Sequence, residues 1–187
     1  MTSSESSNQN SIEVNGVLFE TLVPQPIVTI PPYGEETSVQ FGVRITNLTN
    51  TPYRFDLQLF FPELLNSHQR LILSGINRNT STLIQDSDIP LIIPRKSVKF
   101  LIAVKLIWLH QKFLRLRGEM YGGILDFYEI YERGNLYNLH PGKYQIRFNY
   151  ENQLLNKKMF LLSTGRTQVN QFWIGRVKTP FVQLNFQ

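Results

Sequence analysis

The chain has 187 residues, of which 42% are hydrophobic and 12% aromatic, and this composition supports one domain with a buried core. The absence of cysteine excludes disulfides, thiolate metal sites and a cysteine nucleophile. The formal net charge is +5, and because all 19 Lys and Arg residues follow residue 40, the body of the chain is strongly basic.

The N-terminal segment is polar and acidic. Its first ten residues are nearly all Ser, Asn, Gln, Thr and Glu, a composition that cannot offset the entropy cost of ordering. We therefore expect a flexible acidic tail over residues 1–20 and a single β-sandwich domain over residues 21–187. No basic cap followed by an apolar run opens the chain, and the most apolar run, Val98–Leu109, is short and carries two lysines. The sequence thus predicts no membrane span and, if Met1 is the native start, a cytoplasmic location.

The first half of the chain contains several strand patterns. Residues 21–36 hold four prolines among short apolar pieces, which suits an edge strand followed by a turn. Apolar and polar residues alternate over 38–46 and again over 53–59, the period of a strand with one buried face. Because the segment between them, NLTNTP, is rich in turn formers, we expect these two strands to form a hairpin.

The second half adds three strands and two long connections. Over residues 98–106 the side chains alternate between two faces, and both faces are apolar near the middle of the stretch. This pattern predicts a strand in the centre of a sheet. Shorter alternating strands are expected at 144–150 and 182–186. The connections at 109–138 and 151–172 are long; the first could hold a helical turn or an extra hairpin, and connections of this length are often functional.

A Pro-Gly turn introduces the strand at 144–150. In LHPGKYQIR, Leu139 is the expected buried anchor, Pro141 and Gly142 form the turn, and Tyr144 follows it directly. In Greek-key sandwiches a tyrosine at this place folds over the corner and hydrogen-bonds to the backbone a few residues upstream. The stretch therefore predicts a tyrosine corner.

Three segments resemble the immunoglobulin-like and fibronectin-type-III-like sandwich domains of bacterial proteins. They are the L-x-P-G-x-Y motif at 139–144, WIGRVKT from Trp173 to Thr179, and VRITNLTNTPYRF from Val43 to Phe55, about a third of the chain together. The resemblance implies an all-β, antiparallel Greek-key β-sandwich and a structural role for Trp173. It implies no activity, because such sandwiches host many functions. The connections at 109–138 and 151–172 are longer than this fold requires, so we expect them as two long loop insertions.

No reactive constellation is evident. The three histidines, His68, His110 and His140, lie about 30 or more residues apart and lack metal-ligand spacing. No serine lies in a nucleophile elbow and no glycine loop has phosphate-binding spacing. The acids between residues 119 and 132 could supply paired carboxylates, but solvated side chains are the simpler interpretation. We expect no catalytic residue, metal or cofactor, and hence a non-enzymatic protein.

Binding to another protein is the leading hypothesis. Basic residues near 112–117 and the aromatic connection that follows are the candidate contacts, namely Lys112, Arg115, Arg117, Tyr121, Phe127, Tyr128 and Tyr131. The aromatic connection could instead pack back on the sandwich as a lid. A cytoplasmic protease inhibitor and a nucleic-acid-binding protein are the alternatives, the second because the basic body would attract phosphates. The oligomeric state stays open.

Overall fold

The computed structural model describes residues 10–78, 85–110, 113–120, 123–130, 136–137, 139–153, 157–162 and 165–187. In this part of the chain the regular elements are strands and two short 3₁₀ turns, which confirms the all-β class. The strands are β1 (Ser11–Val14), β2 (Val17–Leu22), β3 (Ile27–Val28), β4 (Glu36–Asn47), β5 (Tyr53–Arg54), β6 (Phe60–Leu65), β7 (Leu71–Arg78), β8 (Leu91–Ile92), β9 (Ser97–Leu109), β10 (Phe113–Met120), β11 (Gly123–Ile130), β12 (Leu136–Tyr137), β13 (Gly142–Asn152), β14 (Lys157–Leu162), β15 (Gly165–Asn170), β16 (Gly175–Lys178) and β17 (Val182–Phe186). The turns are η1 (Leu57–Leu59) and η2 (Asp86–Asp88).

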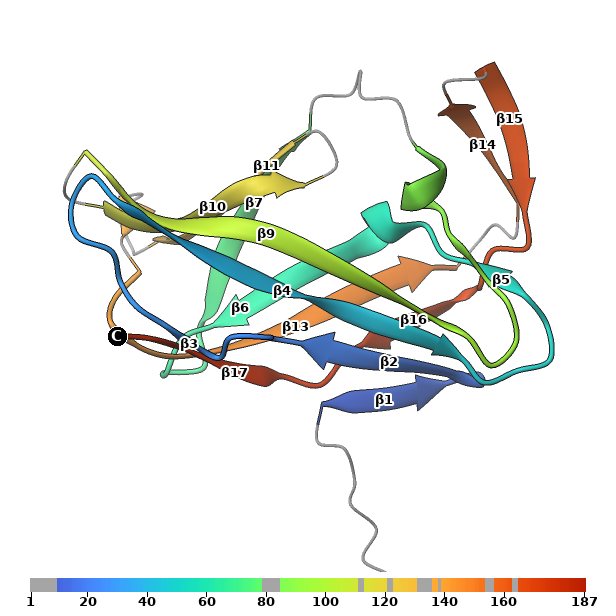
Figure 1. Cartoon of the computed structure of the whole chain (residues 1–187), viewed down its shortest axis with the longest axis horizontal. Coiled ribbons are helices and arrows are strands. Elements are labelled where there is room, and N and C mark those ends of the chain that lie inside the picture. The colour runs from blue at the N-terminus through green and yellow to red at the C-terminus, as the bar shows by residue number, and fades with distance from the viewer. Residues whose placement is uncertain are drawn as a thin grey trace, which may run out of the picture.

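The strands form two layers that face each other across the core (Figure 1). Hydrogen-bonded neighbours follow the order β1-β2-β4-β9-β10-β11-β7-β6-β13-β17-β3, with β12 beside β11 and β16 beside β13. The path folds over at β7, because Leu71 and Ile72 pair with β6 whereas later residues of β7 pair with β11. We call the layer of β1, β2, β4, β9, β10 and β11 the front sheet. The layer of β6, β13, β16, β17 and β3 is the back sheet. The fold is a β-sandwich in this sense.

The ordered fold begins earlier than the composition predicts. β1 and β2 form a hairpin, and Val17 and Phe19 are fully buried. Asn15 and Gly16 both have positive φ, the conformation that two-residue hairpin turns need and that Asn-Gly favours. The expected tail over residues 1–20 is therefore wrong for residues 10–20, and residues 1–9 lie outside the described part.

The expected hairpin between residues 38–46 and 53–59 is wrong as well. β4 pairs with β2 and β9, whereas β5 pairs with β8. The Asp56 side chain accepts a hydrogen bond of 3.2 Å from the Gln58 amide and caps η1, which interrupts the alternation. The chain resumes as β6, which pairs with β13 in the other sheet.

The predicted loop insertions contain strands. Residues 109–138 hold β10, β11 and β12, so the hairpin alternative is correct there, and residues 151–172 hold β14 and β15. Leu114 and Leu116 of β10 and Leu125 of β11 are fully buried, which shows that these strands extend the core. β9 lies between β4 and β10, as its predicted central position requires, although Leu101 on its outer face is 41% exposed.

Five aromatic rings occupy the centre of the sandwich. Phe19 lies 5.2 Å from Trp173 and 6.0 Å from Phe55, measured between ring centroids, and Phe60 lies 4.5 Å from Tyr150. The Trp173 ring lies against the backbone of Gly175, where an added Cβ would approach the ring to 2.3 Å. This contact explains why a glycine follows the tryptophan two positions later.

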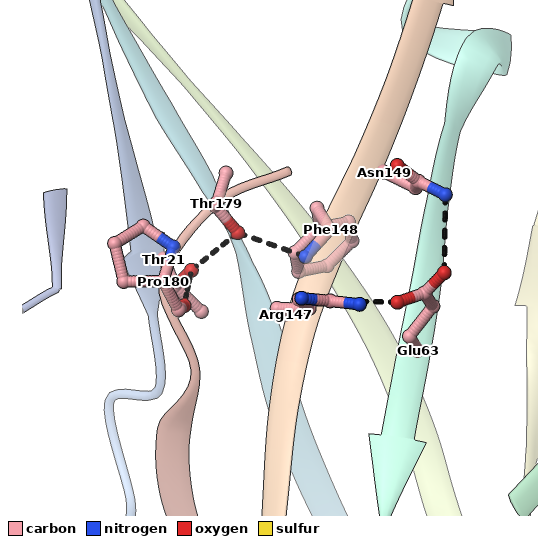
Figure 2. Close-up of polar contacts among 7 residues, drawn as sticks. All are labelled: Thr21, Glu63, Arg147, Phe148, Asn149, Thr179 and Pro180. Atoms are coloured by element: carbon pink, nitrogen blue, oxygen red, sulfur yellow. Dashed lines mark hydrogen bonds and ion pairs between the residues drawn. The ribbon is translucent and has the colours of Figure 1, made fainter. Parts of the chain in front are cut away.

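A chain of hydroxyl groups joins the two sheets at the break between β16 and β17 (Figure 2). The Phe148 amide of β13 donates to the Thr179 hydroxyl (2.8 Å), and the Thr179 amide donates to the Phe148 carbonyl (2.9 Å). The hydroxyl of Thr21 in β2 lies 2.6 Å from the Thr179 hydroxyl and 2.7 Å from the Pro180 carbonyl oxygen. We call this set the threonine clasp; it supplies the bonds that Phe148 would otherwise make to a strand.

Candidate functional site

Three chain segments enclose a groove at the end of the sandwich where β2 begins and β13 ends. The β1–β2 turn, the segment leading into β5 and the segment after β15 line a space of about 380 Å³. We call it the end groove; its lining residues are Asn15, Thr51, Pro52, Tyr53, Gln171, Phe172, Trp173 and Ile174. A space of this size lies within the range of ligand pockets.

The backbone at residues 171–173 is fixed beside β5. The Arg54 amide donates to the Gln171 carbonyl (2.8 Å), and the Trp173 amide donates to the Arg54 carbonyl (3.0 Å). Gln171 has a φ of 67°, a left-handed conformation that non-glycine residues rarely adopt. Strained residues of this kind are enriched at binding sites, because the surrounding structure must hold them in place.

A buried asparagine holds the opposite wall. The Asn47 side-chain amide donates to the carbonyl oxygens of Thr51 (2.8 Å) and Ile92 (2.9 Å). Its side-chain oxygen accepts from the Thr49 amide (3.0 Å) and hydroxyl (2.7 Å). The loop that carries Thr51 and Pro52 is therefore held in one conformation before any ligand arrives, which lowers the entropy cost of binding.

The lining of the end groove is uncharged. Tyr53 is half-buried and Ile174 is 45% exposed, so these two side chains supply the accessible apolar surface, whereas Phe172 and Trp173 are buried beneath it. Asn15, Thr51 and Gln171 add amide and hydroxyl groups at the same place. Such a lining suits an apolar group flanked by hydrogen-bonding atoms, such as the backbone and side chain of a peptide.

The residues predicted as partner contacts do not form one exposed surface. Arg115 is only 5% exposed, and Phe127 is fully buried on the core face of β11, opposite Leu116. These two placements correct the expectation, because neither side chain is accessible to a partner. Lys112, Tyr121 and Tyr131 lie outside the described residues, and for Tyr128 only the backbone, in β11, is described.

The arginines of β10 lie beside an acid of β11. Arg117 is in register with Asp126 across the two strands. Burial raises the pKa of the Asp126 carboxyl above its ordinary value, and the positive charges of Arg115 and Arg117 act in the opposite direction. Both arginines therefore have an acidic side chain of the protein itself as a neighbour.

Other cations are paired too. Arg44 lies 2.7 Å from Glu20, Lys105 2.5 Å from Glu36, Arg147 2.6 Å from Glu63 and Arg176 2.8 Å from Glu151. Glu63 also accepts a hydrogen bond of 3.0 Å from the side-chain amide of Asn149 (Figure 2). Local pairs of this kind neutralise part of the basic surface.

The residues predicted to be structural lie in the core or in its turns. The Tyr144 hydroxyl accepts a hydrogen bond from the His140 amide (2.9 Å) and donates to the His140 carbonyl (3.1 Å), the contact expected of a tyrosine corner. Leu139 and Trp173 are buried, and Gly142, after the exposed Pro141, has a φ of 145°, which favours glycine.

Sequence reasoning missed the end groove. Its walls come from residues more than a hundred positions apart, and each segment by itself reads as an ordinary turn. The one local signal was the Asn-Gly pair at 15–16, which marks a tight hairpin and so one corner of the groove. No group of three His, Asp or Glu side chains suited to hold a metal occurs among the described residues.

Comparisons with known proteins add little to this picture. No family model matches the chain, and no curated protein matches it. A solved structure described as a "putative lipoprotein" from Bacillus subtilis is similar over 87% of this chain and 38% of its own, at 12% identity and a TM-score of 0.34. A match at this level carries no argument about function. In the described part of this chain, no helix is long and apolar enough to cross a membrane.

Proposed function

We propose that this protein is a non-enzymatic binding module that holds a segment of another protein in the end groove. The observation that carries the proposal is a groove with exposed apolar surface and uncharged polar groups, between walls that backbone and asparagine hydrogen bonds hold in place. Protein interfaces typically combine an apolar centre with a few oriented polar groups.

The partner segment would place an apolar side chain against Tyr53 and Ile174. Its backbone amides and carbonyls would then lie close to the side-chain amides of Asn15 and Gln171, which both donate and accept hydrogen bonds. The uncharged lining favours such a segment over an anionic one. This placement replaces the surface near residues 112–131 as the proposed contact.

The immunoglobulin-like type of sandwich is part of the same proposal. The Tyr144 contact and the packing of Trp173 on Gly175 support it, since both occur at the positions that the resemblance implies. Domains of this type often present turns at one end of the sandwich to their partners. The cytoplasmic location stays a prediction, which cell fractionation would test.

The two alternatives have less support. Nucleic-acid binding would use unpaired cations, whereas Arg44, Lys105, Arg147 and Arg176 each have an acidic partner. A protease inhibitor would present an extended loop to an active-site cleft, and inhibition assays against a protease panel would detect it. Neither alternative explains an uncharged groove.

Crosslinking from the groove tests the proposal. A photoreactive residue at position 174 should crosslink one host protein, and the purified partner should bind I174D at least ten-fold more weakly than wild type. Ile27, 60% exposed on β3 in the back sheet, offers the matched control I27D, which should bind normally. If I174D and I27D bind the partner equally well, the end groove is not the interface.

A further inference from the structure

A second pocket brings together two histidines that lie 72 positions apart in the sequence. The β6–β7 turn and the tyrosine corner enclose about 200 Å³, and His68 and His140 both line it. The other lining residues are Asn66, Ser67, Pro141, Gly142, Lys143 and Tyr144. The pairing of Leu65 with Gln145 causes this arrangement, because it places the end of β6 beside the start of β13. We call this space the histidine pocket.

Hydrogen bonds from Asn66 hold one wall. Its side-chain oxygen accepts from the amides of His68 and Arg70, each at 3.0 Å. Its backbone also donates to the Arg70 carbonyl (3.0 Å) and accepts from the Gln69 amide (3.0 Å). Four bonds to one residue fix the turn, so the backbone that carries His68 is in place before a ligand binds.

The tyrosine corner holds the other wall. The Tyr144 hydroxyl bonds to both the amide and the carbonyl of His140, which fixes the backbone of that histidine. The side chain of Gln69 donates to that of Gln145 (3.3 Å) and bridges the two walls. The corner thus has a second consequence besides stability: it positions His140 at the pocket.

The charges around the histidine pocket have one sign. Lys143 lines it, Arg70 closes the same turn, and none of the described residues that line it is acidic. Across from Lys143, β17 contributes the neutral Asn185. The closest acid along β6 is Glu63, which already bonds to Arg147 and Asn149. The imidazole N–H groups of His68 and His140 add hydrogen-bond donors to this surface.

We propose that the histidine pocket binds a small oxyanion. The pocket has room for several water molecules, each of about 30 Å³ in the liquid, and therefore for one phosphate or carboxylate group. Lys143 supplies a positive charge, and the two imidazoles supply N–H groups that can donate hydrogen bonds to an oxyanion. The pocket is distinct from the end groove, because the two lie at opposite ends of β13.

NMR titration of the full chain with sulfate, a small oxyanion, tests this proposal. At constant ionic strength we expect saturable shifts of the His68 and His140 ring signals as sulfate is added. His110 lies outside the pocket and serves as the internal control. Equal shifts of all three histidines, or the absence of saturable shifts, would overturn the proposal.

Substitutions locate the site and identify the oxyanion. H68N, H140N and K143Q should each weaken sulfate binding by at least five-fold, whereas H110N should bind like wild type. His110 has a φ of 51°, a conformation that asparagine tolerates, so H110N should fold normally. Parallel titrations with phosphate and acetate then show whether the pocket prefers a phosphate or a carboxylate. Unchanged binding by all three pocket variants would refute the site.

Discussion

Thr179→Val should destabilise the sandwich more than its conservative size suggests. The substitution keeps the shape but removes the hydroxyl that accepts from the buried Phe148 amide and contacts Thr21. An orphaned buried donor costs about 1–3 kcal/mol, and the lost contact with Thr21 about 1 kcal/mol. We therefore expect a loss of about 2–4 kcal/mol in the free energy of unfolding.

Denaturant unfolding with a double-mutant cycle measures this effect. T21V should cost less, about 1–2 kcal/mol, because Thr179 keeps its bond from Phe148. The double variant should cost less than the sum of the two, since both substitutions remove the same hydroxyl contact. Thr46 is half-buried on the outer face of β4, and T46V is the matched control, expected within about 0.5 kcal/mol of wild type. A T179V variant as stable as T46V would refute the role of the threonine clasp.

Three further predictions concern single side chains. Gly175→Ala should cost about 2 kcal/mol or more and change the Trp173 fluorescence, because the new Cβ would overlap the ring; unchanged stability would contradict this packing. Burial raises the pKa of Asp126 above 3.8 in the folded protein, so the folded state binds this proton more tightly than the unfolded chain does. The free energy of unfolding of the wild type should therefore fall, relative to that of D126N, as the pH rises from 3.8 through the raised pKa. Parallel pH profiles of stability for the two proteins would argue against this effect. Tyr144→Phe should cost about 1–2 kcal/mol and weaken sulfate binding, because it removes both bonds to His140; a stability loss without a change in sulfate affinity would limit the tyrosine to a structural role.

The sequence predicted elements better than it predicted their partners. Alternation located β4 and β9 and the central position of β9, because one buried face imposes a period of two. Alternation does not say which strand pairs with which. The stretch at 53–59 kept the pattern, yet the Asp56 cap turned the chain and sent β6 to the opposite sheet.

The candidate sites were less predictable than the fold. The end groove and the histidine pocket each join turns from distant parts of the chain, so no local motif marks them. His68 and His140 were too far apart in sequence to suggest a shared site, and only the pairing of β6 with β13 brings them together. Charge was misleading for a similar reason: the basic block contains Arg115, which the fold buries, and Arg117, which it places opposite Asp126.

β13 connects the two candidate sites. Its 11 residues span about 35 Å; at one end Tyr144 holds His140, and at the other the Asn152 side chain donates to the Trp173 carbonyl (2.9 Å) beneath the end groove. A shift of this strand by one residue would turn Phe148 and all the other core-facing side chains of β13 toward solvent. Such a shift would disturb both ends of the strand together. A core variant that loses both peptide binding and oxyanion binding therefore indicates a displaced strand. A surface variant at one end of β13 should lose only the binding at that end.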